Sequence, residues 1–189
     1  MGKIAIIIGG ANCVWNDYEQ WKHLALSYEL ELQAKLGNPE YVCIQFETFV
    51  INDSIPLFDD FIDNAVTLHP YKLKYWAHDR NVRGLNIPPK VWAHRTDSLV
   101  TNHTGDWGGS SGLFACKIAL ELQFNKIILC GVPMTAEQQH IVRKADWNAC
   151  KAFQRGWHTR METIKGLVKS YSGWTKDQLG EPTLEWLGN

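Results

Sequence analysis

Residues 101–132 read TNHTGDWGGSSGLFACKIALELQFNKIILCGV, and this stretch decides the fold. It opens with a loop rich in glycine and hydroxyl side chains, at 104–112. The segment 113–122 that follows is apolar and rich in good helix formers. Residues 126–130 form a short apolar run stopped by Gly131, which is typical of a strand buried on both faces of a parallel sheet. The stretch therefore predicts a loop, a helix and a central strand in succession.

The start of that helix, Ser110-Ser111-Gly112, has two interpretations. Small residues there let an anion approach free backbone N–H groups, and the helix dipole favours negative charge at this end. Alternatively, the serines only cap a helix. The local sequence leaves both open.

Length and composition limit the classes of protein. A chain of 189 residues, 45% hydrophobic and 21% charged, is long enough for one well-buried domain and short for two. A net charge of −1 makes nucleic acid an unexpected partner. No stretch is long and apolar enough for a membrane span, and the N-terminus lacks a signal-peptide pattern, so a cytoplasmic protein is expected. Three of the cysteines, Cys43, Cys116 and Cys130, lie in apolar segments and are expected in the core.

The N-terminal run 3–8 is β-branched and continuous, the profile of a central parallel strand, and Gly9-Gly10-Ala11-Asn12 follows it. Ligands of open α/β sheets bind at the carboxyl ends of strands, and a glycine pair lets them come close to the backbone. The pattern is not GxGxxG, so a dinucleotide fingerprint is absent. A plain βα turn is the alternative for Gly9 and Gly10.

The other expected elements follow from periodicity and turn signals. We expect strands at 41–46, 65–68 and 90–94, and helices at 16–35, from Pro70 onward and at 136–163. Asn52-Asp53 follows an apolar run and either holds a ribose or base edge or forms an Asx-turn. His69 falls at a strand's carboxyl end, where it either faces a cleft or is a structural residue.

Several catalytic patterns are absent: the sequence has no Walker A lysine, GxSxG, HExxH or closely spaced acidic pair, and no metal site is expected. His103 and His140 flank the central stretch, and either can act as a general base near neutral pH.

Taken together, the GGAN turn, the Asn-Asp pair and GGSSGLFACKIALELQFNKIILCGV resemble the Rossmann-like core of certain bacterial sialyltransferases. They are also similar to hydroxymethylpterin-diphosphokinase-like proteins, and the SGWT and LGEPTLEWL tail is similar to small uncharacterised phage-encoded proteins. The first loop has Ala-Asn where those families favour Gly-Pro-Ser. The resemblance implies nucleotide contact by eight residues: Gly9, Gly10, Asn12, Asn52, Asp53, Ser110, Ser111 and Gly112.

We therefore predict an α/β fold, a single Rossmann-like three-layer domain with a mainly parallel sheet and a helical, Trp-rich C-terminal extension. Residues 1–135 would form the nucleotide-binding core, and 136–189 a helix and tail packed on it. The predicted function is a glycosyltransferase-like enzyme that uses a nucleotide-activated donor, a general base and no cofactor or obligate metal. A non-catalytic phage or bacterial assembly protein that keeps the core is the alternative, and a homo-oligomer is left open.

Overall fold

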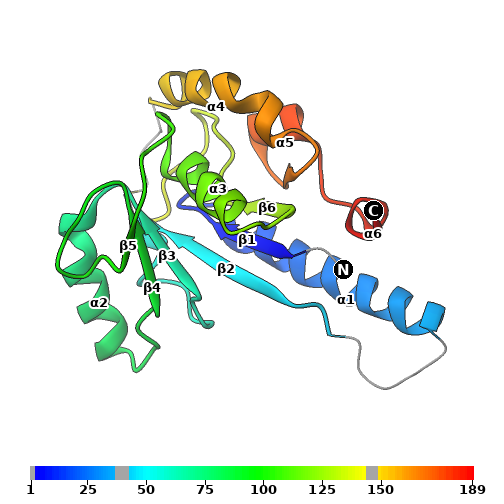
Figure 1. Ribbon diagram of the computed structural model, residues 1–189, viewed down its shortest axis with the longest axis horizontal. Helices are drawn as coiled ribbons and strands as arrows, with labels where there is room; N and C mark the ends of the chain where they lie inside the picture. Colours follow the sequence, from blue (N-terminus) through cyan, green and yellow to red (C-terminus); the bar gives the residue numbers. More distant parts are fainter. Residues whose placement is uncertain (1–2, 37–42, 144–148) are drawn as a thin grey trace.

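A computed structural model describes residues 3–36, 43–143 and 149–189. Its centre is a seven-stranded sheet in the order β5-β4-β3-β2-β1-β6-β7, in which all neighbouring strands are parallel (Figure 1). The strands are β1 (Ile4–Ile8), β2 (Phe46–Ile51), β3 (Asn64–Thr67), β4 (Lys90–Ala93), β5 (Asn102–His103), β6 (Lys126–Cys130) and β7 (Val168–Ser170). The predicted α/β fold with a parallel sheet is confirmed.

Helices cover both faces of the sheet. They are α1 (Val14–Leu36), α2 (Leu73–Val82), α3 (Ser111–Glu121), α4 (Cys150–Ile164), α5 (Gly173–Leu179) and α6 (Leu184–Gly188), with short 3-10 turns η1 (Asn52–Ser54) and η2 (Pro70–Lys72). One apolar cluster joins the sheet to α1, α2 and α6, and a second joins it to α3, α4 and α5. The result is a three-layer domain with two separate cores.

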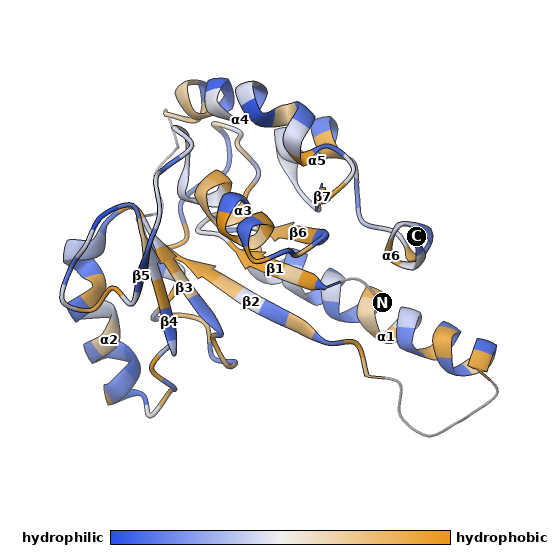
Figure 2. Ribbon diagram, viewed as in Figure 1, coloured by the Kyte–Doolittle hydropathy of each residue, from blue (hydrophilic) through white to orange (hydrophobic). Residues whose placement is uncertain are grey.

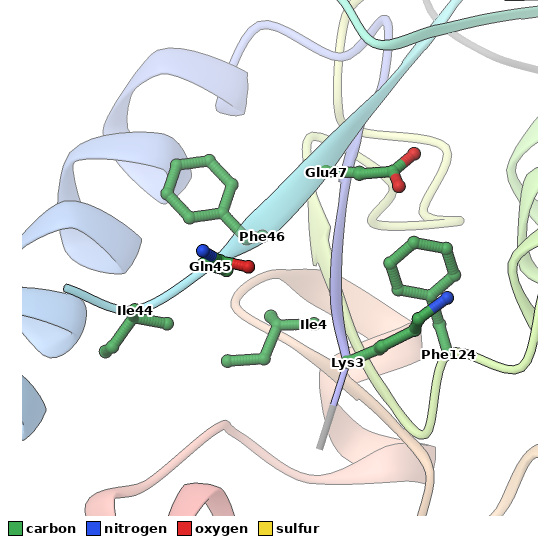
Figure 3. A pocket seen from close by; sticks show the side chains of 7 residues that line it. All are labelled: Lys3, Ile4, Ile44, Gln45, Phe46, Glu47 and Phe124. Atoms are coloured by element: carbon green, nitrogen blue, oxygen red, sulfur yellow. The ribbon is translucent and has the colours of Figure 1, made fainter. Parts of the chain in front are cut away.

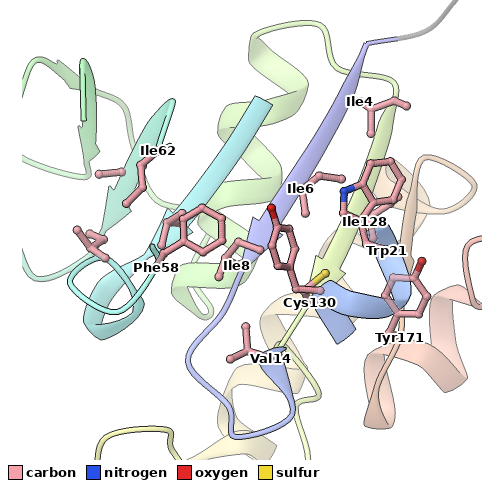
Figure 4. Packing of buried hydrophobic residues seen from close by; sticks show 14 of the residues in the cluster. Ile4, Ile6, Ile8, Val14, Trp21, Phe58, Ile62, Ile128, Cys130 and Tyr171 are labelled. Atoms are coloured by element: carbon pink, nitrogen blue, oxygen red, sulfur yellow. The ribbon is translucent and has the colours of Figure 1, made fainter. Parts of the chain in front are cut away.

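The strand β1 lies at the middle of the sheet because its sequence is apolar on both faces. All five of its residues are at most 2% exposed. Ile6 and Ile8 belong to one cluster (Figure 4), and Ala5 and Ile7 belong to the other. Figure 2 shows the same apolar character along the neighbouring β6. Full burial of an isoleucine contributes roughly 1.5–3 kcal/mol, so these strands are a main source of stability.

Several predicted elements are confirmed within one or two residues: the first strand, the helix at 113–122, the strand at 126–130, and those at 65–68 and 90–94. The strand predicted at 41–46 is wrong: residues 41–42 lie outside the described part, and β2 begins only at Phe46. Asp17 lies in the first turn of α1 and is 1% exposed. Its carboxylate accepts hydrogen bonds from the Gly131 N–H and the Ser172 hydroxyl, because the helix start packs against the end of β6.

The C-terminal third differs most from expectation. Residues 136–143 are turns rather than the start of a helix, residues 144–148 lie outside the described part, and α4 begins only at Cys150. Residues 136–143 cannot form a helix here because Asn12, His140 and Ile141 belong to a backbone pairing between two loops. The short strands β5 and β7 were not expected, and β7 means that residues after 135 contribute to the sheet.

Cys116 and Cys130 are fully buried free thiols, as predicted. Cys43 is exposed, so its assignment to the core was wrong, since β2 starts after it. Within the described residues, no helix combines the length and apolar character needed to span a membrane.

Candidate functional site

Gly9 and Gly10 follow the carboxyl end of β1, and the structure gives them different neighbours. A Cβ on Gly9 would lie 2.2 Å from the carbonyl oxygen of Gly131, so this glycine is required by the close approach of two backbone segments. A Cβ on Gly10 would instead lie 3.3 Å from Nε2 of His140. The absence of a side chain at Gly10 therefore leaves space for the imidazole of His140, whereas at Gly9 it allows the backbone segments after β1 and β6 to approach each other.

Asn52 connects the ends of β2 and β3 with the start of α3. Its backbone is left-handed (φ 50°), a conformation that Asn tolerates better than most residues. Its side chain accepts a hydrogen bond from the Thr67 hydroxyl at 2.8 Å and donates one to Oγ of Ser111 at 2.8 Å. The Ser111 hydroxyl accepts this bond and so keeps its own O–H as a donor.

Asp53 is the carboxylate at the carboxyl edge of the sheet, in the turn η1 that directly follows β2. Its Oδ1 accepts hydrogen bonds from Nζ of Lys72 at 3.3 Å and from the indole N–H of Trp76 at 3.2 Å. Its Oδ2 lies 3.5 Å from Nε2 of His140. Two contacts from the α2 side fix the carboxylate, which leaves Oδ2 as the oxygen directed at the imidazole.

His140 is held over Gly10 by paired loops. The N–H of Asn12 donates to Gln139 and that of Ile141 to Gly10, at 2.9 and 2.8 Å. Nδ1 of His140 accepts the backbone N–H groups of Val142 and Arg143 at 3.2 and 3.3 Å. Because Nδ1 is an acceptor, the neutral ring carries its proton on Nε2, facing Asp53.

The edge around Asp53 is rich in cations. The pKa of His140 is lowered first by its burial and further by Arg143 and Lys72, against an opposing effect of Asp53. The pKa of His69 is lowered by partial burial and then by Lys72, again opposed by Asp53. Both imidazoles are therefore mainly neutral near neutral pH.

The start of α3 is built partly for packing. Ser110 caps the helix, because its Oγ accepts the Leu113 N–H at 3.3 Å, and it also accepts the Trp157 indole N–H at 3.1 Å. A Cβ on Gly112 would lie 2.7 Å from a methyl group of Val132. The capping interpretation thus holds for Ser110, whereas Ser111 faces the polar edge through Asn52.

The structure brings some of the predicted site residues together and leaves others apart. Asp53 contacts His140, which lies over Gly10, and Asn52 contacts Ser111. The chain bond between Asn52 and Asp53 joins the two groups, and His69 interacts electrostatically with Asp53. Asn12 is exposed and is positioned through its backbone bond to Gln139. His103 is exposed on edge strand β5, with β4, β3 and β2 between it and β1. The structure therefore separates the two candidate bases, and only His140 lies beside Asp53.

Sequence reasoning missed three residues of this edge: Thr67, Lys72 and Arg143. Thr67 ends β3 and Lys72 ends the 3-10 turn after Pro70, so both follow a predicted strand closely. That proximity was a usable signal. Arg143 had none, because residues 136–163 looked like one helix.

One further hollow lies at the end of the sheet opposite to the one where open α/β folds bind their ligands. A hollow of about 330 Å³ lies at the amino ends of β1 and β2, opposite to Asp53, and is lined by residues that include Lys3, Phe46 and Phe124 (Figure 3). No group of three or more His, Cys, Asp or Glu side chains suited to a metal ion occurs among residues 3–36, 43–143 and 149–189.

An all-parallel, open sheet whose strand ends carry polar groups defines a Rossmann-like α/β fold. The fold resembles that of a bacterial sialyltransferase, CstII of Campylobacter jejuni. Its complex with a trisaccharide acceptor and CMP superimposes with a TM-score of 0.56 at 12% identity, covering 96% of this chain and 87% of that one. Complexes with CMP and with CMP-3FNeuAc give TM-scores of 0.52 and 0.53 at 13% identity, covering 97% and 96% of this chain and 87% of each. By sequence, no family model and no curated protein matches the chain.

Proposed function

We propose that the protein is a glycosyltransferase-like enzyme that binds a nucleotide-activated sugar at the carboxyl edge of β1, β2 and β3. The observation that carries the proposal is the junction of the Asp53–His140 pair with the Asn52–Ser111 hydrogen bond in a cationic surround. The fold similarity to CstII, which was solved with CMP and a CMP-sugar analogue, supports the same class of ligand.

The nucleotide's phosphate would lie at the start of α3. The first N–H groups of a helix lack intrahelical partners, and the helix dipole favours an anion there. The Ser111 O–H adds a donor directed at the polar edge, and the cations Lys72 and Arg143 add positive potential. Asn52 would act by holding Ser111 rather than by contacting the ribose, since both ends of its amide are engaged.

In the proposed reaction, an acceptor hydroxyl attacks the anomeric carbon of the donor sugar. The new C–O bond forms as the bond from that carbon to the phosphate oxygen breaks, and the nucleotide leaves with the electron pair. The hydroxyl proton passes to the base, for which we propose His140. Its lowered pKa keeps the imidazole near pH 7 in the neutral form, which is the form that a general base requires. His69 would contribute to nucleotide binding, as would Gly9 and Gly10 through the shape of the loop.

For His140 to accept the hydroxyl proton, one of its ring nitrogens must have a free lone pair that faces the acceptor. With Nδ1 accepting two backbone N–H groups and Nε2–H facing Asp53, no ring lone pair is directed at a substrate. The base becomes competent when turn 140–143 releases Nδ1, whose lone pair then accepts the hydroxyl proton while the Nε2 proton stays between the ring and Asp53. Asp53 then stabilises the imidazolium that results, as a carboxylate partner does for a catalytic histidine.

The test is a calorimetric titration with CMP, UMP and their sugar conjugates, followed by assays of donor turnover. Ser111→Ala is expected to weaken nucleotide binding about tenfold, or about 1.4 kcal/mol. Ser98→Ala, at an exposed position of the loop after β4, is the matched control and should bind normally. His140→Gln should retain binding and lose turnover. Turnover should persist in EDTA, because protein cations can neutralise the leaving phosphate.

Two outcomes would contradict the proposal. One is a folded wild-type protein that binds none of these nucleotides at millimolar concentration. The other is nucleotide binding that is unaffected by both Ser111→Ala and Asp53→Asn, which would place the ligand elsewhere.

A further inference from the structure

A second hollow adjoins the loop that carries His140. It has a volume of about 460 Å³, within the range of small-molecule sites. Its walls come from the start of α1, the segment after η1 and the loop after β6: Trp15, Tyr18, Glu19, Lys22, Leu57, Phe58, Asp59, Asp60 and Ile141. Ile141 directly follows His140, and its N–H is bonded to Gly10 at 2.8 Å. The hollow therefore borders the proposed site of transfer.

Aromatic rings form its apolar surface. The Trp15 ring stacks on Phe58 with a centroid distance of 6.4 Å and an interplanar angle of 16°. Phe58 is 1% exposed and meets Tyr18 edge-on at 5.3 Å, whereas Trp15 is 38% exposed. A buried pair thus supports an indole ring that remains open to solvent, which is a rigid flat surface for a ligand with an apolar face.

Acidic groups form its polar surface. Glu19 pairs with Lys22, and Asp59 pairs with Arg83. Asp60 accepts the hydroxyl of Tyr18 at 3.2 Å, a contact with a neutral donor rather than a cation. Three carboxylates against one lining ammonium group make this hollow unfavourable for an anion, in contrast to the cationic edge around Lys72 and Arg143.

The two sides of the His140 loop therefore select opposite ligands. The cationic side suits the charged donor, and the acidic, aromatic side suits a neutral molecule that offers hydroxyl donors and an apolar face. A sugar ring has both features, because its C–H groups gather on one face and its hydroxyls lie around the rim.

We propose that the Trp15–Asp60 hollow is the acceptor subsite, and that it takes a neutral saccharide. In this arrangement the sugar packs on the Trp15 ring, its hydroxyls donate to Asp60 and Glu19, and one of them reaches past Ile141 toward His140. The inference rests on the proposed transferase function and adds the chemical class and location of the acceptor.

The experiment is ligand-observed NMR and calorimetry with methyl β-galactoside, methyl β-glucoside and lactose, on protein without nucleotide. The wild type should bind at least one of these sugars. Trp15→Ala should weaken that binding at least tenfold and leave CMP affinity unchanged, and Trp15→Phe should recover part of the loss. Asp60→Asn should also weaken sugar binding. Tyr75→Ala, which removes another exposed ring outside the hollow, is the control and should have no effect.

Failure of this inference is distinguishable from failure of the proposed function. A wild type that binds CMP and none of the three sugars, with or without CMP present, overturns the acceptor subsite and leaves the nucleotide site standing. Sugar binding that survives both Trp15→Ala and Asp60→Asn also overturns it, because the sugar would then bind elsewhere. A folded wild type that binds neither CMP nor UMP nor their sugar conjugates would instead refute the proposed function.

Discussion

Replacing Gly9 by alanine should destabilise the protein strongly, while the same change at Gly10 should not. The Cβ on Gly9 would lie 2.2 Å from a backbone oxygen and 2.6 Å from a methyl group of Val132. Carbon–oxygen contacts are normally about 3.3 Å or longer, so the two segments would have to separate by about 1 Å.

The backbone at Gly9 has little freedom to make that adjustment. Its N–H donates to Cys130 at 2.7 Å and its C=O accepts the Ser54 hydroxyl at 2.6 Å. Overpacking of this kind costs about 1–3 kcal/mol and occasionally more, and we expect the upper end. For a domain of this size, about 3 kcal/mol corresponds to a fall in Tm of about 6–12 °C.

At Gly10 the new methyl group would meet the His140 ring at 3.3 Å, and a half-buried side chain can move by a few tenths of an ångström. The entropy that alanine removes from the unfolded chain, about 0.4–1 kcal/mol, offsets much of the strain. Gly10→Ala should therefore melt near the wild type while shifting the imidazole NMR signals of His140.

The melting temperatures and urea midpoints of Gly9→Ala and Gly10→Ala test this difference. Gly105→Ala is the control, because no atom lies within 4 Å of a Cβ built at that position. If Gly9→Ala melts within about 2 °C of Gly105→Ala, a difference of less than about 1 kcal/mol, the close packing of the β1 and β6 loops is refuted. An unchanged His140 signal in Gly10→Ala would refute the contact proposed for that ring.

Three further outcomes are expected. Arg143→Gln should raise the pKa of His140, because it removes a like charge, so the acid limb of the activity profile should move to higher pH; an unchanged limb would exclude Arg143 from the field at His140. Gly112→Val should lower Tm, because its side chain would meet Val132 in the core, and a variant of wild-type stability would contradict that packing. Asp17 has a pKa raised by burial, so the native state holds its proton more tightly than the unfolded chain. The favourable contribution of this proton to the free energy of unfolding is complete below pH 3.8 and is lost as pH rises through the raised pKa. Between about pH 4 and about pH 7, the urea midpoint of the wild type should therefore fall relative to that of Asp17→Asn. Midpoints that change in parallel would refute this.

The strands that could be predicted from the sequence are those whose own side chains require burial on both faces of the sheet. Residues 4–8 and 127–130 are apolar at every position, and only burial on both faces of a sheet accommodates such a run. By contrast, β5 and β7 are two and three residues long and contain polar side chains. Hydrogen bonding to a neighbouring strand defines them, and that neighbour is not visible in the local sequence.

The candidate site was predictable in its location but less so in its chemistry. Asn52-Asp53 and Ser111 followed or preceded recognisable elements, so their meeting at one edge followed from parallel topology. Local sequence could not show that Gly9 and Gly112 serve packing, because the groups that crowd them, Gly131 and Val132, come from distant parts of the chain. The role of Asp17 was hidden for the same reason.

The central position of β1 has a kinetic consequence. Ile4–Ile8 pairs with β2, and also with β6, which emerges from the ribosome about 120 residues later. At a synthesis rate of about 5–20 residues per second, β6 is synthesised roughly 6–24 s after β1, and during this interval one edge of β1 has no partner strand. Such a segment is a hazard for intermolecular strand pairing during that interval. A chaperone that shields nascent apolar strands should therefore raise the yield of native protein.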